Sequence, residues 1–93
     1  MGVLLSWTGE NGADLYAHGK CRDISLDGLR VETLAAIPAQ SHINVRVEKM
    51  EVSGSARVRY VRRGRMGHVL GLELRTLVRQ QLLDALRDAT PGS

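Results

Sequence analysis

The sequence predicts a mainly β fold: a six-stranded antiparallel barrel followed by one C-terminal α-helix. Three observations lead to this prediction. Short segments alternate apolar and polar residues, as half-buried antiparallel strands do. Turn-forming glycine and asparagine residues separate these segments. Near Thr76 the apolar spacing changes to that of an amphipathic helix.

The first half of the chain is expected to contain three strands. Val3, Leu5 and Trp7 recur at every second position, which is the period of a strand. The pair Asn11-Gly12 is a strong signal for a chain reversal. With a bend over residues 23–28, the predicted strands cover residues 3–8, 15–22 and 28–33.

The second half is expected to add three more strands. The clearest is Ile43 to Val47, where apolar and polar residues alternate without a break. Ser53-Gly54 is interpreted as a turn or bulge. Tyr60 is interpreted as a core residue, because it follows the inward pattern of Val58. The other two strands are predicted over residues 56–60 and 69–74, with a turn over 64–67.

A helix is expected from Thr76 to Ala89. Its apolar residues follow one another at spacings of four, three, one and three, so they form a single stripe. This stripe has to be buried against the barrel, in its open end or against another chain. Its members are Val78, Leu82, Ala85, Leu86 and Ala89.

Length and composition suit one small domain. The chain has 93 residues, 43% hydrophobic and 25% charged, so we expect a single domain over residues 1–90 and a disordered tail over 91–93. No apolar run approaches the roughly 20 residues of a membrane span, and we expect no secretory signal, because the first residues do not show a basic and then apolar segment. Membrane insertion is therefore not expected. The single cysteine, Cys21, cannot form an internal disulfide, which favours a cytoplasmic location.

Positive charge is concentrated in the later part of the chain. Residues 56–79 contain seven arginines and one acidic residue, Glu73, which gives +6 within a formal net charge of +3. Such a cluster can attract phosphates or an acidic protein face. A solvated strand edge has the same composition, because charged residues keep strand edges from aggregating. Both interpretations stay open.

The sequence contains no recognisable catalytic or metal-binding set. Ser25 has no obvious base beside it. His18, His42 and His68 lie in three separate predicted segments. A structural zinc site needs about four nitrogen or sulfur ligands, and Cys21 is instead expected to be a small hydrophobe on a strand. We therefore expect no enzymatic activity, no metal and no cofactor.

A nucleic-acid-binding barrel is a further possibility that the composition does not favour. Such a barrel needs phosphate contacts and, for single strands, aromatic side chains for stacking. The arginines would serve, but the aromatic residues are only Trp7, Tyr16 and Tyr60. Since Tyr60 is expected in the core, nucleic acid is not expected as a partner.

The most informative segment is Asp23-Ile24-Ser25-Leu26-Asp27-Gly28. Asp and Ser favour turns because their side chains bond nearby backbone amides, and glycine can adopt a positive φ. By itself the segment is a well-made turn between strands. The segment has the pattern Asp-x-Ser-x-x-Gly, and four further segments follow it in a fixed order. These are the apolar strand that begins at Leu29, the alternating strand that begins at Ile43, and the segments Gly54 to Val58 and Leu70 to Leu74. In this context the chain resembles the PilZ domain family over residues 3–75.

The resemblance implies a six-stranded barrel that acts as a bacterial signalling or adaptor module and a receptor for cyclic di-GMP. In that family the Asp/Asn-x-Ser-x-x-Gly motif forms one part of the ligand site. Asp23 and Ser25 would hydrogen-bond the guanine or the ribose-phosphate ring. Gly28 would permit the bend and a close approach of the ligand.

The other part of the family's site, an Arg-x-x-x-Arg loop before the first strand, has no counterpart here, because the first arginine is Arg22. Two lost charge-assisted hydrogen bonds of about 1.5 to 3 kcal/mol each would lower the affinity by several orders of magnitude. Three explanations are open. The loop lies upstream of Met1 in a longer chain, or Arg22, Arg57 and Arg59 replace it, or the domain is a degenerate member that binds a protein and not the nucleotide. A protein partner or a fused domain is expected in each case.

Overall fold

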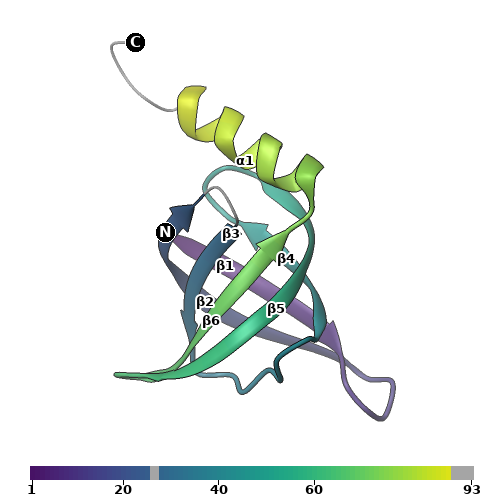
Figure 1. Cartoon of the computed structure of the whole chain (residues 1–93). Coiled ribbons are helices and arrows are strands. Elements are labelled where there is room, and N and C mark those ends of the chain that lie inside the picture. The colour runs from purple at the N-terminus through teal and green to yellow at the C-terminus, as the bar shows by residue number, and fades with distance from the viewer. Residues whose placement is uncertain (26–27, 89–93) are drawn as a thin grey trace.

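The alternating segments of the sequence form six strands in the computed structural model, which describes residues 1–25 and 28–88. In this part of the chain all strand pairs are antiparallel, and the order β1-β2-β3-β6-β5-β4 closes on itself through β1 and β4 (Figure 1). The predicted fold class, a six-stranded antiparallel barrel with a C-terminal helix, is confirmed. The elements are β1 (Gly2–Thr8), β2 (Asp14–Ser25), β3 (Gly28–Thr33), β4 (His42–Val47), β5 (Val52–Gly64), β6 (Gly67–Leu74) and α1 (Thr76–Asp88).

The apolar half of the alternating strands fills the barrel interior. In β4, His42, Asn44 and Arg46 are exposed, and the residues that alternate with them are buried. Ile37, from the connection between β3 and β4, and Leu82, from α1, join the same core. The buried apolar side chains are Val3, Leu5, Leu29, Val31, Ile37, Ile43, Val45, Val47, Val52, Ala56, Val58, Leu70, Leu72, Leu74 and Leu82.

The predicted bend between β2 and β3 is too long. β2 continues to Ser25 and β3 begins at Gly28, so Asp23 lies within a strand. The predicted strand end at Arg22 is wrong because the ladder with β3 continues past a bulge there. Residues 26 and 27 of the motif lie outside the described residues.

Ser53-Gly54 does not turn the chain. The turn between β4 and β5 covers residues 48–51, and both Ser53 and Gly54 pair with β4. Gly54 instead lies under the helix, because a Cβ at this position would overlap the side chain of Val78. Glycine here allows α1 to approach the backbone of β5 closely.

Helix α1 packs at one end of the barrel, mainly against β5 (Figure 1). Leu82 is buried, and Val78, Ala85 and Leu86 pack against the core, so the described part of the predicted stripe faces the barrel. Ala89 and residues 91–93 lie outside the described residues. No helix in the described part of the chain is long and apolar enough to cross a membrane.

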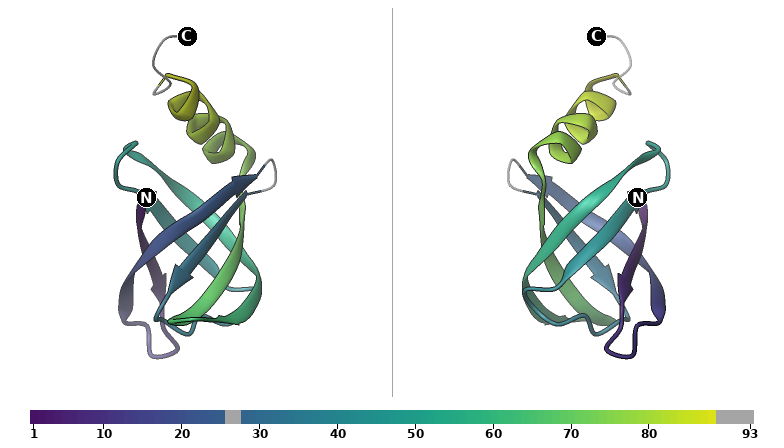
Figure 2. Two further views of the ribbon diagram at one scale, coloured as in Figure 1. Left: turned by 90° about the vertical axis from the view of Figure 1, so that its left-hand side faces the viewer. Right: turned by 90° about the vertical axis from the view of Figure 1, so that its right-hand side faces the viewer.

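The two ends of the barrel differ (Figure 2). The helix lies at the end where β2 finishes and β3 begins. The β1–β2 and β5–β6 hairpins lie at the opposite end. Because β5 is 13 residues long, it contacts the helix near its start and leads into an exposed hairpin at its finish.

Candidate functional site

A shallow hollow of about 220 Å³, called here the motif hollow, lies on the outer face of the barrel. It is formed where β2, β3, β6 and β5 run side by side. The β2–β3 hairpin contributes the predicted motif, and β5 and β6 contribute the opposite wall. Its lining residues are Asp23, Ser25, Gly28, Leu29, Arg30, Arg59, Tyr60, Gly71 and Leu72.

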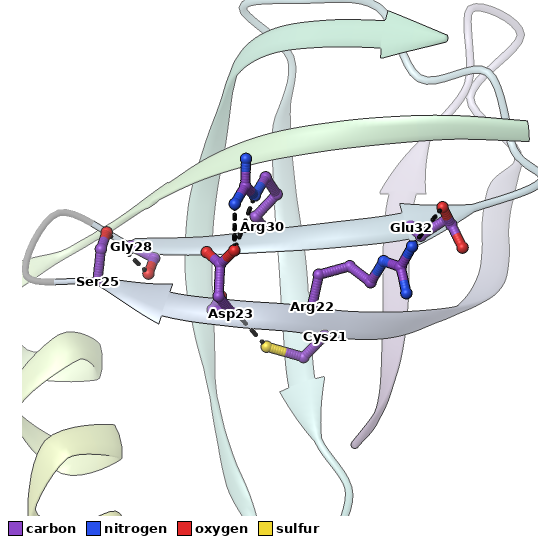
Figure 3. Close-up of polar contacts among 7 residues, drawn as sticks. All are labelled: Cys21, Arg22, Asp23, Ser25, Gly28, Arg30 and Glu32. Atoms are coloured by element: carbon purple, nitrogen blue, oxygen red, sulfur yellow. Dashed lines mark hydrogen bonds and ion pairs between the residues drawn. The ribbon is translucent and has the colours of Figure 1, made fainter. Parts of the chain in front are cut away.

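Asp23 is held by an arginine on the neighbouring strand (Figure 3). The register places Asp23 opposite Arg30, and Nε and Nη2 of Arg30 both donate to Asp23 Oδ2, the Nε bond at 2.9 Å. The hydrogen bond to Asp23 and its negative charge raise the pKa of the Arg30 guanidinium. Both side chains are about half exposed. The carboxylate is therefore paired across strands, yet a ligand at the surface can reach it.

Ser25 and Gly28 bring the hairpin against the rest of the barrel. Ser25 Oγ donates to the carbonyl oxygen of Gly28 at 3.4 Å (Figure 3). The backbone of Gly28 passes so close to β6 that a Cβ would overlap the carbonyl oxygen of Leu72. The close approach requires glycine here. The motif therefore positions β3 on β6 and keeps Asp23 at the rim of the hollow.

The prediction that Tyr60 belongs to the core is wrong. A bulge between Val58 and Tyr60 shifts the alternation of β5, so both Arg59 and Tyr60 line the outer hollow. The Tyr60 ring lies over Gly71, where a Cβ would overlap it. The guanidinium of Arg62 lies 4.8 Å from the ring centroid, a cation–π contact. The bulge thus turns an expected core position into an aromatic wall.

The three supporting arginines predicted from the sequence lie in different places. Arg59 lines the motif hollow, whereas Arg22 and Arg57 border two neighbouring hollows. Arg22 lies 3.5 Å from Glu32. Oε2 of Glu73 lies 3.0 Å from Nη2 of Arg57 and 3.7 Å from Nε of Arg59. Most of the positive charge beside the motif is therefore compensated within the domain.

The strand order, the motif and the helix agree with a known family. A model of the PilZ domain matches residues 2–89, nearly the whole chain. The chain belongs to the PilZ domain family. Comparisons with curated proteins and with solved structures gave no significant match. PilZ domains are binding and adaptor modules whose known role is cyclic di-GMP signalling.

Arg30, Tyr60 and Gly71 are candidate residues of this PilZ domain that the sequence did not reveal. For Arg30 a signal is present, because it lies between the buried Leu29 and Val31 and must face outward. Tyr60 and Gly71 could not be assigned to the outer face, because that requires the bulge in β5, and the residue pattern does not indicate a bulge. Tyr60 of β5 pairs with Gly71 of β6.

No metal centre is assembled within the described residues of the PilZ domain, since they contain no group of three or more His, Cys, Asp or Glu side chains that could hold an ion. His18 lies beside Glu48 at 3.6 Å. Cys21 directs its Sγ at the carbonyl oxygen of Asp23 at 3.5 Å (Figure 3). Burial raises the pKa of the Cys21 thiol, which lowers the fraction present as thiolate.

Proposed function

We propose that this PilZ domain is a bacterial cytoplasmic signalling module that binds cyclic di-GMP in the motif hollow. The bound state would then be passed to a protein partner or a fused domain. The observation that carries the proposal is the convergence of Asp23 and Ser25 with Arg59 and Tyr60, which are distant in sequence, on one hollow. Membership of the PilZ family supports the same ligand.

The chemistry of the hollow matches such a ligand. The Asp23 carboxylate would accept hydrogen bonds from guanine N–H groups, and the Ser25 hydroxyl can donate to or accept from ribose and phosphate oxygens. The guanidinium of Arg59 would bind a phosphate through its planar fork. The face of Tyr60 would stack on a guanine base. These groups come from β2 and from β5, so one ligand would bridge the two strands.

The ion pairs in the hollow determine the cost of binding. To reach a phosphate, Arg59 has to exchange Glu73, and to reach a guanine, Asp23 has to share or release Arg30. Exposed pairs of this kind contribute about 0 to 1 kcal/mol each. Each exchange therefore lowers the affinity by at most about five-fold.

A protein-interaction module that does not bind the nucleotide is the second candidate. The observation that favours it is the compensation of Arg22, Arg57 and Arg59 by acidic neighbours. Little net positive charge then remains for a ligand with two phosphates. In this alternative the motif serves folding alone, through the close packing of Gly28 on β6.

Calorimetric titration with cyclic di-GMP separates the two candidates. We expect heat of binding and amide shifts at Asp23, Ser25 and Tyr60 in NMR spectra. The double variant Asp23→Ala, Ser25→Ala should bind at least about ten-fold more weakly, since it loses charge-assisted hydrogen bonds.

A matched control is the double variant Asn44→Ala, Ser53→Ala, two exposed polar residues on β4 and β5 outside the motif hollow. Its affinity should equal that of the parent. Absence of heat and of shifts at millimolar ligand would contradict the receptor proposal and leave the protein-interaction module. Unchanged affinity in the Asp23→Ala, Ser25→Ala variant would mean that the site lies elsewhere.

A further inference from the structure

The tip of the β5–β6 hairpin, residues 62–67, carries positive charge that the domain does not compensate. Arg62, Arg63 and Arg65 are exposed, and none of them has an acidic partner among the described residues. The guanidinium of Arg62 lies over the ring of Tyr60. Residues 62–67 contain no acidic residue. The hairpin tip therefore presents its charge to solvent.

One acidic side chain does approach the base of the hairpin. A Cβ on Gly64 would lie 3.2 Å from Oε2 of Glu32. That carboxylate already pairs with Arg22, and the Glu32 side chain is only 18% exposed. Glu32 therefore compensates Arg22, and it forms no ion pair with the arginines of the tip.

Two large apolar side chains are exposed on neighbouring segments here. Met66, in the turn, is 74% exposed, and Leu34, which follows β3, is 78% exposed. Gly67 joins them, because its backbone lies against that of Leu34: a Cβ on Gly67 would lie 3.0 Å from Leu34 Cα. Single exposed apolar residues are common on proteins. Here two lie on neighbouring backbone segments, and the hairpin that carries Met66 also carries three arginines.

We propose that the hairpin tip docks on an anionic membrane surface, with Met66 and Leu34 among the lipid headgroups and the arginines on the lipid phosphates. The tip lies at the end of the barrel opposite the helix (Figure 1). A stable protein interface buries about 1,200 to 2,000 Å², far more than a turn and one neighbouring side chain offer. A membrane surface can bind so small a patch, because a few apolar side chains can insert among the mobile headgroups while neighbouring basic residues contact the lipid phosphates.

Sedimentation with lipid vesicles tests this docking surface. The whole chain should partition onto phosphatidylcholine vesicles that contain phosphatidylglycerol, and not onto phosphatidylcholine alone. Binding should weaken as salt is raised. Each basic residue near an anionic leaflet contributes about five-fold, so the Arg63→Gln, Arg65→Gln variant should lose about 30-fold in partitioning. The Leu34→Ser, Met66→Ser variant should lose about ten-fold.

The matched control is the Arg46→Gln, Arg75→Gln variant, which makes the same charge change at two exposed arginines outside the hairpin. Its partitioning should stay near that of the parent. NMR line broadening at residues 62–67 and at Leu34 of the parent, on addition of the anionic vesicles, would support the same surface without any substitution. The Asp23→Ala, Ser25→Ala variant should keep vesicle binding, which separates this proposal from the nucleotide site.

Three results would overturn the proposal. One is the absence of partitioning onto the anionic vesicles. Another is an equal loss in the hairpin variants and in the control variant, which would point to net charge alone. The third is a shift of the hairpin amides by a poly-glutamate peptide under conditions where the vesicles have no effect, which would indicate an acidic protein partner.

Discussion

Strand β5 and its hairpin place arginines in two different environments. Arg57 and Arg59 share the carboxylate of Glu73, whereas Arg63 and Arg65 have no acidic partner in the described structure. In the sequence they belong to one basic run. The difference comes from the cross-strand register, because Arg57 pairs with Glu73 and Arg63 pairs with His68. Charge counted along a chain therefore overstates what is available to a ligand wherever a neighbouring strand supplies the opposite charge.

The largest expected effect tests whether Gly28 of the motif is needed for the stability of the fold. Gly28→Ala would push a Cβ into the carbonyl oxygen of Leu72, and we expect a loss of at least about 3 kcal/mol in the free energy of unfolding. Urea denaturation measures it. Gly12→Ala is the control, because Gly12 also has a positive φ but no atom lies within 4 Å of its Cβ position; it should cost about 1 to 2 kcal/mol. Equal losses would assign the cost to backbone strain alone.

The next effect concerns the aromatic wall of the motif hollow. Gly71→Ala would overlap the Tyr60 ring and should cost about 2 kcal/mol. In a Tyr60→Ala background the same substitution should cost much less, because the overlapping ring is gone. A double-mutant cycle from thermal or urea unfolding measures this coupling. Additive losses would mean that the ring does not rest on Gly71 in solution.

Glu73→Gln would leave the arginines near the motif hollow without an acidic partner, like those of the hairpin tip. It releases Arg57 and Arg59 from their shared partner, so the affinity for cyclic di-GMP should rise by up to about five-fold. Calorimetric titration measures the change. Glu48→Gln serves as the control, since Glu48 lies beside His18, which does not line the hollow. Equal gains in both variants would show that net charge matters and that the local pairing does not.

The smallest effect is expected at the hairpin. Arg63→Gln, Arg65→Gln should change the free energy of unfolding by less than about 0.5 kcal/mol, because exposed side chains without partners contribute little to folding. Thermal unfolding of this variant beside the parent measures it. A loss above 1 kcal/mol would show that these arginines make folding contacts after all, and would remove the contrast between the two environments.

The barrel itself could be predicted because burial of one strand face leaves a period of two in the sequence, as in His42–Val47. The reversal between β2 and β3 followed from the turn residues of the family motif, but the bulge at Arg22 extends β2 and places Asp23 in the strand and not in the predicted bend. Tyr60 could not be placed, since the bulge beside it shifts the alternation by one residue. Gly54 could not be interpreted either, because glycine serves both turns and close approaches, and the position of Val78 decides between them.

The closure of the barrel limits how this domain can recognise other molecules. β1 pairs with both β2 and β4, and in the described sheet every strand has a neighbour on each side. No strand of the described sheet is an edge along its whole length, so strand addition, by which some domains recognise peptides, is confined to segments that pair on one side only, such as residues 14–18 of β2 and 59–64 of β5. Over the rest of the barrel, recognition has to use side chains of the outer face, the hairpins or the helix. Such contacts change through single substitutions that leave the ladder intact, so new partners can evolve without a new fold.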